Sequence, residues 1–519
     1  MTGQNLSIAE EQGDARNVRE LLEQRAGRTP DKVFLFSEAD GRRFTYAEFA
    51  AAVNRTARLL ASKGIGKGIV VSLLLPNSAE YIIAYFACFK LGALAGPVNS
   101  LLKPQEMAYV IAHSEARALL VHTEFLPKVE EVRAELPALK SVIEFDDEKR
   151  ATAEFAGDNL PPCDIEKNDE AIIIYTSGTT GKPKGCLLTH GNLLANARQI
   201  TSWLKFTERD RLLIVMPLFH VNAVMVATLA PLYANGSTVI TPKFSVSRFW
   251  QTISDYKITS FGSVATMLSL LANTYPEGVP AGLNTEQLRF ALCGSAPVPA
   301  EVLKRFEETF HCLVIEGYGM SETTCRSTFN PPDERRRPGS CGLPIGNEMK
   351  IVDEDVAVVA DGQLGEIVLR GENILKGYFK NEEATAAAFR GGWFHTGDIG
   401  YRDADGFYYI VDRKSDMIIR GGENIYPREI DEVLYSHEAV AAAATIGVPD
   451  PLYGEEVFAF VVLKEGASLT EEELLSFCRE RLADYKCPKA IRFVADIPKG
   501  PTGKLLKREL ASLYGKNQS

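Results

Sequence analysis

Short apolar runs alternate with helical patterns through the first part of the chain. NVRELLEQRA and TYAEFAAAVNRTARLLASKG repeat apolar residues at helical spacing, whereas VVSLLLPN and AIIIYTSG contain short continuous apolar runs. Apolar runs between helices are typical of strands buried on both faces in a largely parallel sheet. The pattern therefore predicts an α/β fold of layered, mixed sheets covered by helices.

Several of the predicted strands end in small or polar residues. They are AIIIYTSG, RLLIVMPL, RFALCGSAP and CLVIEGYG. We expect the first to run through a glycine-rich loop into a helix from Gly191 to Trp203. Ligands of α/β proteins bind at the carboxyl ends of strands, so these four ends are the expected binding region.

The pattern changes after about Arg335. GEIVLRGENILKGYF and GFYYIVDR predict short alternating strands, which indicate a small β-rich subdomain. From Ser415 onward, about a hundred residues predict a compact α+β unit. The charged stretch Asp412 to Asp416 is the expected hinge. We therefore predict an N-terminal domain of residues 1–414 and a smaller, mobile C-terminal domain of residues 415–519.

Composition narrows the classes of partner. The 57 Lys and Arg residues against 68 Asp and Glu residues give a net charge of -11, which argues against a general nucleic-acid binder. No apolar stretch has the length expected of an integral membrane segment, and we expect no signal peptide from the first residues. The nine cysteines are scattered without C-x-x-C pairs, which suits reduced thiols and a cytoplasmic location.

A loop rich in Gly, Ser, Thr and Lys is the strongest single motif. TSGTTGKPKG begins at Thr176 and places hydroxyl and ammonium groups beside glycines, a combination suited to a polyphosphate. The spacing between Gly178 and Gly181 excludes a Walker P-loop. A plain solvated loop is the alternative interpretation of this motif.

TSGTTGKPKG closely resembles the signature loop of the adenylate-forming superfamily of acyl-CoA synthetases, adenylation domains and luciferases. Other segments that resemble this superfamily follow in order, namely GSAP from Gly294, EGYGMSE from Glu316, HTGD from His395 and PKGPTGK from Pro498. The resemblance covers nearly the whole chain. It implies an AMP-forming acid:CoA ligase that uses ATP, Mg²⁺ and coenzyme A.

The resemblance also implies roles for individual residues. The residues expected to contact ATP are Thr176, Ser177, Gly178, Thr179, Thr180, Lys184, Ser295, Ala296, Glu316, Gly317, Tyr318 and Ser321. Asp398 is expected to accept hydrogen bonds from the ribose, Arg413 to contact ribose or phosphate, and Glu322 to bind Mg²⁺.

Three further residues are assigned to the reaction itself. Lys504 is the expected main adenylation residue, because its loop can project a cation toward the reacting carboxylate and α-phosphate. Gly422 matches a segment that passes close to CoA after the small domain rotates. His220, in MPLFH, is the expected gate of the acyl pocket. The neighbouring Lys499 and Lys507 are interpreted as solvated charges.

The acid is left open by the sequence. A short- or medium-chain carboxylic acid is favoured, because no lipid-sized apolar insertion is evident, and KFSVSRFWQTISDYKITSFG resembles crotonobetaine/carnitine-CoA ligases. Arg326 and the run Arg335 to Arg337 suggest either carboxylate recognition or, preferably, a solvated face. A carrier-protein-loading enzyme, a luciferase-like oxygenase and an inactive nucleotide-binding protein are the alternatives. A homodimer is possible.

Overall fold

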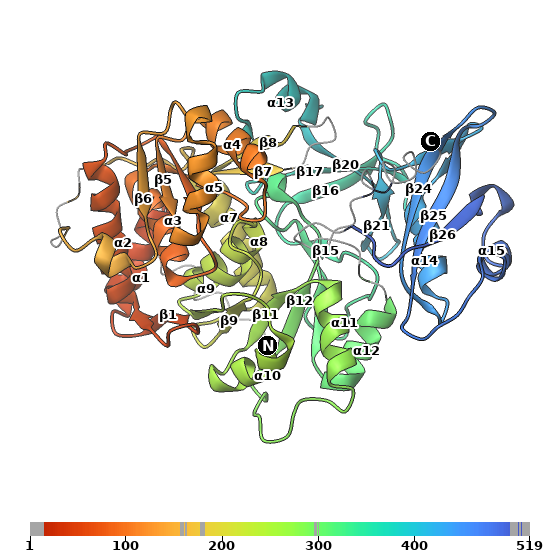
Figure 1. Ribbon diagram of the computed structural model, residues 1–519, viewed down its shortest axis with the longest axis horizontal. Helices are drawn as coiled ribbons and strands as arrows, with labels where there is room; N and C mark the ends of the chain where they lie inside the picture. The colour runs from red at the N-terminus through yellow and green to blue at the C-terminus, as the bar shows by residue number, and fades with distance from the viewer. Residues whose placement is uncertain are drawn as a thin grey trace, which may run out of the picture.

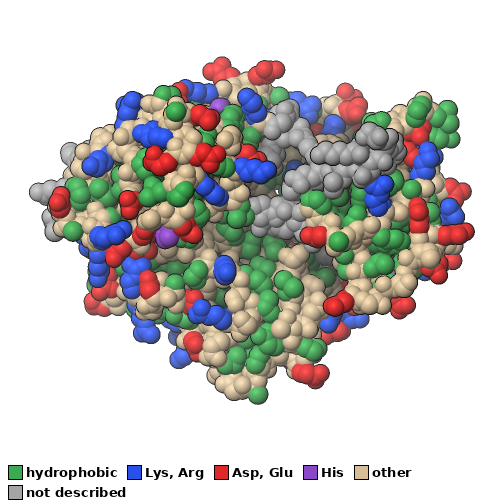
Figure 2. All heavy atoms as spheres, in the orientation of Figure 1, with side chains coloured by type: hydrophobic (Ala, Val, Ile, Leu, Met, Phe, Trp, Pro, Cys, Tyr) green, Lys and Arg blue, Asp and Glu red, His purple; other side chains and the backbone are tan. Residues whose placement is uncertain are grey.

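The computed structural model describes residues 15–155, 160, 163–176, 182–294, 298, 300–498, 507 and 510. Figure 1 shows two large sheets with their helices in red to green, a smaller sheet beside them, and the C-terminal residues in blue at one end. On the face in Figure 2, acidic and basic side chains are interspersed.

The first seven-stranded sheet contains three of the four predicted strand ends. Every neighbouring pair in it is parallel except β1 with β2. Its order is β13 (Leu313–Glu316), β12 (Phe290–Cys293), β11 (Ser260–Ser263), β9 (Arg211–Ile214), β10 (Ser237–Ile240), β1 (Val33–Ser37) and β2 (Arg43–Thr45).

The second seven-stranded sheet is mixed. Its order is β18 (Gly377–Tyr378), β8 (Lys184–Thr189), β7 (Glu170–Thr176), β4 (Leu94–Pro97), β3 (Val70–Leu74), β5 (Ala118–Val121) and β6 (Ser141–Glu144). The pairs β7 with β8 and β8 with β18 are antiparallel, and the others are parallel.

One sequence-based expectation for this sheet was wrong. The chain does not pass from the glycine-rich loop straight into a helix, because β8 returns antiparallel to β7 and only then does α7 (His190–Leu204) begin. The run KGCLLT is too short for its periodicity to reveal a strand. Thr176 and Lys184 are consequently paired across the hairpin.

Helices fill the space between the two sheets. Helix α3 (Ala79–Leu91) is buried along its whole length and contacts β1 of one sheet and β3 of the other. Its charged residues are paired, Glu80 with Arg42 and Lys90 with Glu23. The helices α1 (Val18–Arg28) and α2 (Tyr46–Ser62) pack against it. None of the described helices has the length and apolar character needed to cross a membrane.

Other helices cover the outer faces. On the second sheet, α4 (Pro104–His113) and α5 (Leu126–Glu131) enclose a separate apolar core. Beside the first sheet lie α10 (Val246–Asp255), α11 (Ala265–Thr274) and α12 (Ala300–Phe310). Rings of α10 and α12 contact Phe261 of β11.

The remaining residues form the two smaller units expected from the sequence. An antiparallel sheet contains β16 (Glu348–Val352), β17 (Gly365–Arg370), β19 (Phe389–Arg390), β20 (Trp393–Arg402) and β21 (Tyr408–Arg413). The C-terminal unit contains β22 (Ile418–Arg420), β23 (Glu423–Ile425), α14 (Pro427–Tyr435), β24 (Val440–Asp450), β25 (Gly454–Leu463), α15 (Glu471–Arg479) and β26 (Ala490–Phe493). Apolar residues from Ile418 onward form cores of their own there. The predicted fold class is confirmed.

The two units touch around the expected hinge stretch. The backbone N–H of Arg428, in α14, donates to Asp412 Oδ2 at 2.9 Å, and its guanidinium donates to the Ile410 carbonyl. The Lys414 N–H donates to the Gly397 carbonyl at 2.8 Å. The boundary between residues 414 and 415 stays a prediction.

Candidate functional site

Three parallel strands of the first sheet end side by side. The register pairs Ser263 of β11 with Cys293 of β12, and Cys293 with Glu316 of β13. The chain therefore leaves the sheet at the same edge three times, at Val264, Gly294 and Gly317. Ligands of α/β proteins bind at such an edge.

One group of polar side chains joins the two large sheets near this edge. We call Thr176, Lys184, Glu322 and Tyr378 the Glu322 cluster. Glu322 Oε1 accepts from the Tyr378 hydroxyl at 3.2 Å and from the Thr176 hydroxyl at 3.5 Å. The Lys184 ammonium lies 5.3 Å from the centre of the Tyr378 ring. A carboxylate, two hydroxyls and a cation thus lie where the glycine-rich loop leaves and rejoins the sheet.

A second group links the segment after β13 with the antiparallel sheet. We call Tyr318, Asp398 and Arg413 the Asp398 cluster. The Tyr318 hydroxyl donates to Asp398 Oδ2 at 2.6 Å, and Arg413 Nε lies 3.4 Å from Asp398 Oδ1. Asp398 and Arg413 are also cross-strand partners in β20 and β21. Burial and the Asp398 carboxylate raise the pKa of Tyr318 well above its usual value, so the phenol stays a donor.

Glu316 stands apart from both clusters. Its carboxylate accepts from the Gly339 N–H at 2.9 Å, and Asn330 N–H donates to its carbonyl at 2.8 Å. Burial raises the pKa of Glu316 to about 7. The backbone of Gly317 passes so close to Phe329 that an added methyl group would lie 2.4 Å from that ring. Ser321 begins the short 3-10 helix Ser321–Thr323.

His220 lies directly before α8 (Val221–Val224), which continues into the π-helix Met225–Leu229. Its ring lies 4.6 Å from that of Phe219, and its Nε2 is buried with no hydrogen-bond partner among the described residues. Burial lowers the pKa of His220 to about 4, so the imidazole is neutral near pH 7. The next residue but one, Asn222, has its side-chain oxygen against Gly262 of β11. The π-helix is a feature often found at functional sites.

Gly422 lies in a hairpin turn of the C-terminal unit. With Gly421 it forms the two-residue turn between β22 and β23, and both glycines have positive φ, 60° and 90°. This is the conformation that glycine adopts without steric cost. Both residues are exposed at the tip of the hairpin.

Several expected site residues lie outside the described residues. They are Ser177, Gly178, Thr179, Thr180, Ser295, Ala296 and Lys504.

The structure corrects the interpretation of several cations. Arg326 is only 2% exposed, so it is not on a solvated face. By contrast, Arg335, Arg336 and Arg337 form ion pairs with Asp333, Glu307, Asp403 and Asp405. Lys507 is not a plain solvated charge either, since its ammonium lies 3.7 Å from the buried Asp431.

Tyr378 was missed by the sequence analysis. It lies in the run ENILKGYF, which predicts only a strand, and nothing in that run signals a contact with Glu322. The contact arises because the two-residue strand β18 pairs with β8, which places Tyr378 opposite Cys186.

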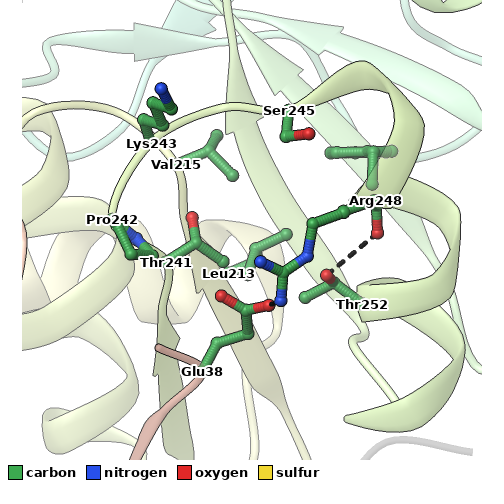
Figure 3. Close-up of a pocket in the computed structure, with 10 residues that line it drawn as sticks. Glu38, Leu213, Val215, Thr241, Pro242, Lys243, Ser245, Arg248 and Thr252 are labelled. Carbon is green, nitrogen blue, oxygen red and sulfur yellow. Dashed lines mark hydrogen bonds and ion pairs between the residues drawn. The ribbon is translucent and has the colours of Figure 1, made fainter. Parts of the chain in front are cut away.

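A cavity of about 150 Å³ lies elsewhere on the first sheet (Figure 3). Its lining includes Thr241 after β10 and Glu38 after β1, and Glu38 points at the guanidinium of Arg248, with which it forms an ion pair. None of the residues assigned to the reaction lines it. The cavity is therefore separate from the two clusters described above.

The donor set fits a magnesium ion held mainly by a nucleotide. No group of three or more His, Cys, Asp or Glu side chains suited to a metal occurs in the described part of the chain. Mg²⁺ bound with a nucleotide needs only one or two protein carboxylates, with phosphates and water supplying the other ligands. Glu322, with the Thr176 hydroxyl beside it, meets this requirement.

Comparisons with known proteins identify the family of the chain. Residues 22–379 match the AMP-binding enzyme family, and residues 429–504 match the AMP-binding enzyme C-terminal domain. The chain is 39% identical to the sulfoacetate–CoA ligase of Cupriavidus necator, over 94% of this chain and 96% of that protein. It is 34% identical to the long-chain-fatty-acid–CoA ligase FadD13 of Mycobacterium tuberculosis, over 96% and 99%.

A solved coenzyme A synthetase has a similar fold. The o-succinylbenzoate coenzyme A synthetase MenE of Bacillus subtilis, in complex with ATP and a magnesium ion, is similar with a TM-score of 0.84 at 35% identity. The match covers 94% of this chain and 98% of that one. The family match spans most of the chain and contains both clusters except Asp398 and Arg413, which lie between its two matched regions. The chain therefore belongs to the AMP-binding enzyme family.

Proposed function

We propose that this acid–thiol ligase activates a short- or medium-chain carboxylic acid with ATP and transfers it to coenzyme A. The observation that carries the proposal is the position of the two clusters on one stretch of chain. Tyr318 of the Asp398 cluster and Glu322 of the Glu322 cluster are four residues apart, directly after β13. One nucleoside triphosphate can extend from the first cluster to the second.

The two clusters have complementary chemistry for ATP. In the Asp398 cluster, the carboxylate would accept hydrogen bonds from the ribose hydroxyls, and the nearby Arg413 partly neutralises its negative charge. In the Glu322 cluster, Lys184 and Thr176 would contact the phosphates, and Glu322 would hold Mg²⁺. The metal ion, when bound, neutralises charge on the phosphate oxygens.

The reaction has two steps. A carboxylate oxygen of the acid attacks the α-phosphorus of ATP, and pyrophosphate leaves with the electrons of the broken bond. Lys504 stabilises the charge that develops between the carboxylate and the α-phosphate. The thiol of CoA, on losing its proton, then attacks the acyl carbonyl carbon, and AMP leaves.

Rotation of the C-terminal domain about Ser415 is part of the proposal. It would exchange Lys504 for the hairpin that carries Gly422. The contacts of Arg428 with Asp412 and with the Ile410 carbonyl are polar hydrogen bonds, which such a rotation could exchange for bonds to water. His220 is proposed as the gate of the acyl pocket. Its neutral imidazole lets an uncharged part of the acid pass.

The relatives do not decide the length of the acid. One relative is named for sulfoacetate and another for long-chain fatty acids. Support for a short acid comes from Arg326, because its guanidinium packs against Gly294 and fills space at the ends of β12 and β13. A long apolar chain would have to bury itself against that charge. Function in the cytoplasm, where ATP and CoA are available, remains part of the proposal.

The test is pyrophosphate release by the purified full chain with ATP, Mg²⁺ and acids from acetate to palmitate, with and without CoA. Turnover that requires CoA and falls with chain length is the expected result. Pyrophosphate release that does not depend on CoA would favour the carrier-loading alternative. A preference for palmitate would contradict the short-acid proposal.

A further inference from the structure

Arg326 is a buried arginine at the carboxyl edge of the first sheet. Its side chain is 2% exposed. Its backbone is fixed by Asn196, whose Nδ2 donates to the Arg326 carbonyl at 2.7 Å and whose Oδ1 accepts from the Arg326 N–H at 3.2 Å. Asn373 Nδ2 donates to the same carbonyl at 3.3 Å. The residue is held in one place by groups that are themselves buried.

A strained turn brings the chain to that position. Thr324 has φ 64° and ψ -39°, and the Cys325 N–H donates to the Thr323 carbonyl at 2.7 Å, which closes a γ-turn. A threonine in this conformation is rare and costs free energy. The Thr324 hydroxyl donates to the Asn373 carbonyl at 2.7 Å and holds the turn. The turn separates Glu322 on one side from Arg326 on the other.

The guanidinium lies between two strand ends. Arg326 Nη1 donates to the Gly317 carbonyl at 3.0 Å, and an added methyl group at Gly294 would lie 2.3 Å from the same atom. The charge also lies over the Phe329 ring, 5.4 Å from its centre. Gly294 and Gly317 follow neighbouring strands, so the guanidinium sits beside the backbone that leads to Tyr318.

The charge of Arg326 has no anion among the described residues. No described carboxylate lies within ion-pair distance, and its Nε is buried with no hydrogen-bond partner among them. Glu316, on the adjoining strand, is committed to the Gly339 N–H instead. A buried cation without an anionic partner destabilises the folded state, because its desolvation is not compensated by a nearby negative charge. An anionic ligand would remove that destabilisation.

We propose that Arg326 determines substrate specificity by binding a second anionic group, a carboxylate or a sulfonate, on a short acid. The proposal rests on the function proposed above and names its substrate class. The planar guanidinium suits such groups because its paired N–H donors match two oxygens of one anion. The guanidinium lies beside Gly317, which directly precedes Tyr318 of the proposed nucleotide site, and this position suits a short acid.

A phosphate of ATP is the other possible anion. The Glu322 cluster already provides Lys184, Thr176 and a carboxylate for the phosphates and their metal ion. Arg326 makes none of these contacts, and its Nη1 donates to the Gly317 carbonyl instead. The two sources differ in a measurable way. If Arg326 bound phosphate, its loss would weaken ATP with every acid; if it binds the acid, only acids with two anionic groups are affected.

The experiment is isothermal titration calorimetry with the full chain saturated with AMP. The acids are compared in pairs, and each acid is titrated separately. The pairs are malonate with propionate, succinate with butyrate, and 3-sulfopropionate with butyrate. The proteins are the wild type, Arg326→Met, Arg326→Lys and the surface control Arg335→Met. Melting temperatures establish that each variant is folded. If Arg326→Met does not fold, Arg326→Lys, which keeps the positive charge, is compared with the wild type instead. AMP and ATP affinities are measured on nucleotide-free samples of the same four proteins.

The wild type is expected to bind at least one diacid or sulfo acid more tightly than its partner. Arg326→Met should weaken that acid about 30-fold or more, the loss typical of truncating a buried charged partner, while the monoacid and ATP change little. Arg326→Lys should fall in between, and Arg335→Met should match the wild type. Equal binding within every pair by the wild type, or an equal loss for both members in Arg326→Met, would overturn the proposal.

CoA-dependent turnover is followed separately on the same four proteins with ATP and without added AMP. Charge-dependent binding without turnover would contradict the proposed ligase function and leave the role of Arg326 standing. Turnover with monoacids alone would overturn the role of Arg326 and leave the ligase standing.

Discussion

The hydroxyl of Tyr318 donates to Oδ2 of Asp398 at 2.6 Å, although the two residues are 80 positions apart. The bond ties the loop after β13 to strand β20 of the antiparallel sheet. The other carboxylate oxygen, Asp398 Oδ1, lies 3.4 Å from Arg413 Nε. The phenol therefore orients the carboxylate that we assign to the ribose.

Tyr318→Phe tests this orientation. Hydrogen bonds to charged groups contribute about 1.5–3 kcal/mol, so the KM for ATP should rise about tenfold or more, with a smaller change in kcat. Steady-state pyrophosphate release at saturating acid measures both constants. Tyr408→Phe is the control, since its hydroxyl donates at 2.6 Å to a backbone carbonyl, that of Met349. Equal effects of the two variants on the KM for ATP would refute the assignment.

Glu322→Gln tests the magnesium site. Loss of the anionic ligand should raise the Mg²⁺ concentration for half-maximal activity by about tenfold or more, while excess Mg²⁺ restores part of the rate. A Mg²⁺ titration at fixed ATP measures this. Glu372→Gln is the control, because Glu372 forms exposed ion pairs with Lys167 and Arg198. An unchanged Mg²⁺ requirement in Glu322→Gln would place the metal elsewhere.

Lys504→Ala should separate the two half-reactions. Removal of the cation should slow adenylation by about 100-fold or more, because it acts on charge that develops in that transition state. Thioester formation from a supplied acyl-adenylate should stay close to the wild-type rate. Single-turnover assays of each step, with Lys499→Ala as the control, measure the two rates. An equal loss in both steps would contradict this division.

Gly422→Ala tests the CoA hairpin against a matched glycine. Gly422 and Gly466 both have positive φ, and an added methyl group would contact nothing within 4 Å at either position. Alanine should cost each site about 1 kcal/mol of stability through backbone strain. Only Gly422→Ala is expected to raise the KM for CoA, as measured with preformed acyl-adenylate. If Gly466→Ala raises it equally, the hairpin has no special role.

Glu316 should make stability depend on pH. Burial raises its pKa from 4.5 to about 7, so its contribution is fully present below pH 4.5 and is lost as pH rises toward 7. Above that range the folded state carries a penalty that Glu316→Gln removes. The free energy of unfolding of Glu316→Gln, relative to the wild type, should therefore increase from pH 5 to pH 8 by up to about 3 kcal/mol.

Urea unfolding at pH 5, 6, 7 and 8 measures this difference. Glu348→Gln is the control, because Arg370 lowers the pKa of that exposed carboxylate and it titrates below this window. A flat difference between Glu316→Gln and the wild type across the window would show that Glu316 is ionised in the folded protein at all four pH values.

The sequence by itself determined the fold class and the family. Buried strands such as β12 and β13 appear as apolar runs because both faces are covered, and the motifs at Thr176, Tyr318 and Asp398 follow one another in order. These features depend on local spacing, which the chain displays directly. The antiparallel strand β8 was missed, because a six-residue run carries too little periodicity to separate it from a loop.

Only the tertiary structure decided how distant side chains meet. The contact of Tyr378 with Glu322 depends on the pairing of β18 with β8, and the burial of Arg326 depends on Asn196 and Asn373, which are 130 and 47 positions away. An arginine in a polar stretch resembles a surface residue in the sequence, since burial is a property of the packed neighbours. Charge pairing is equally non-local: Arg335, Arg336 and Arg337 have carboxylate partners, whereas Arg326 has none among the described residues.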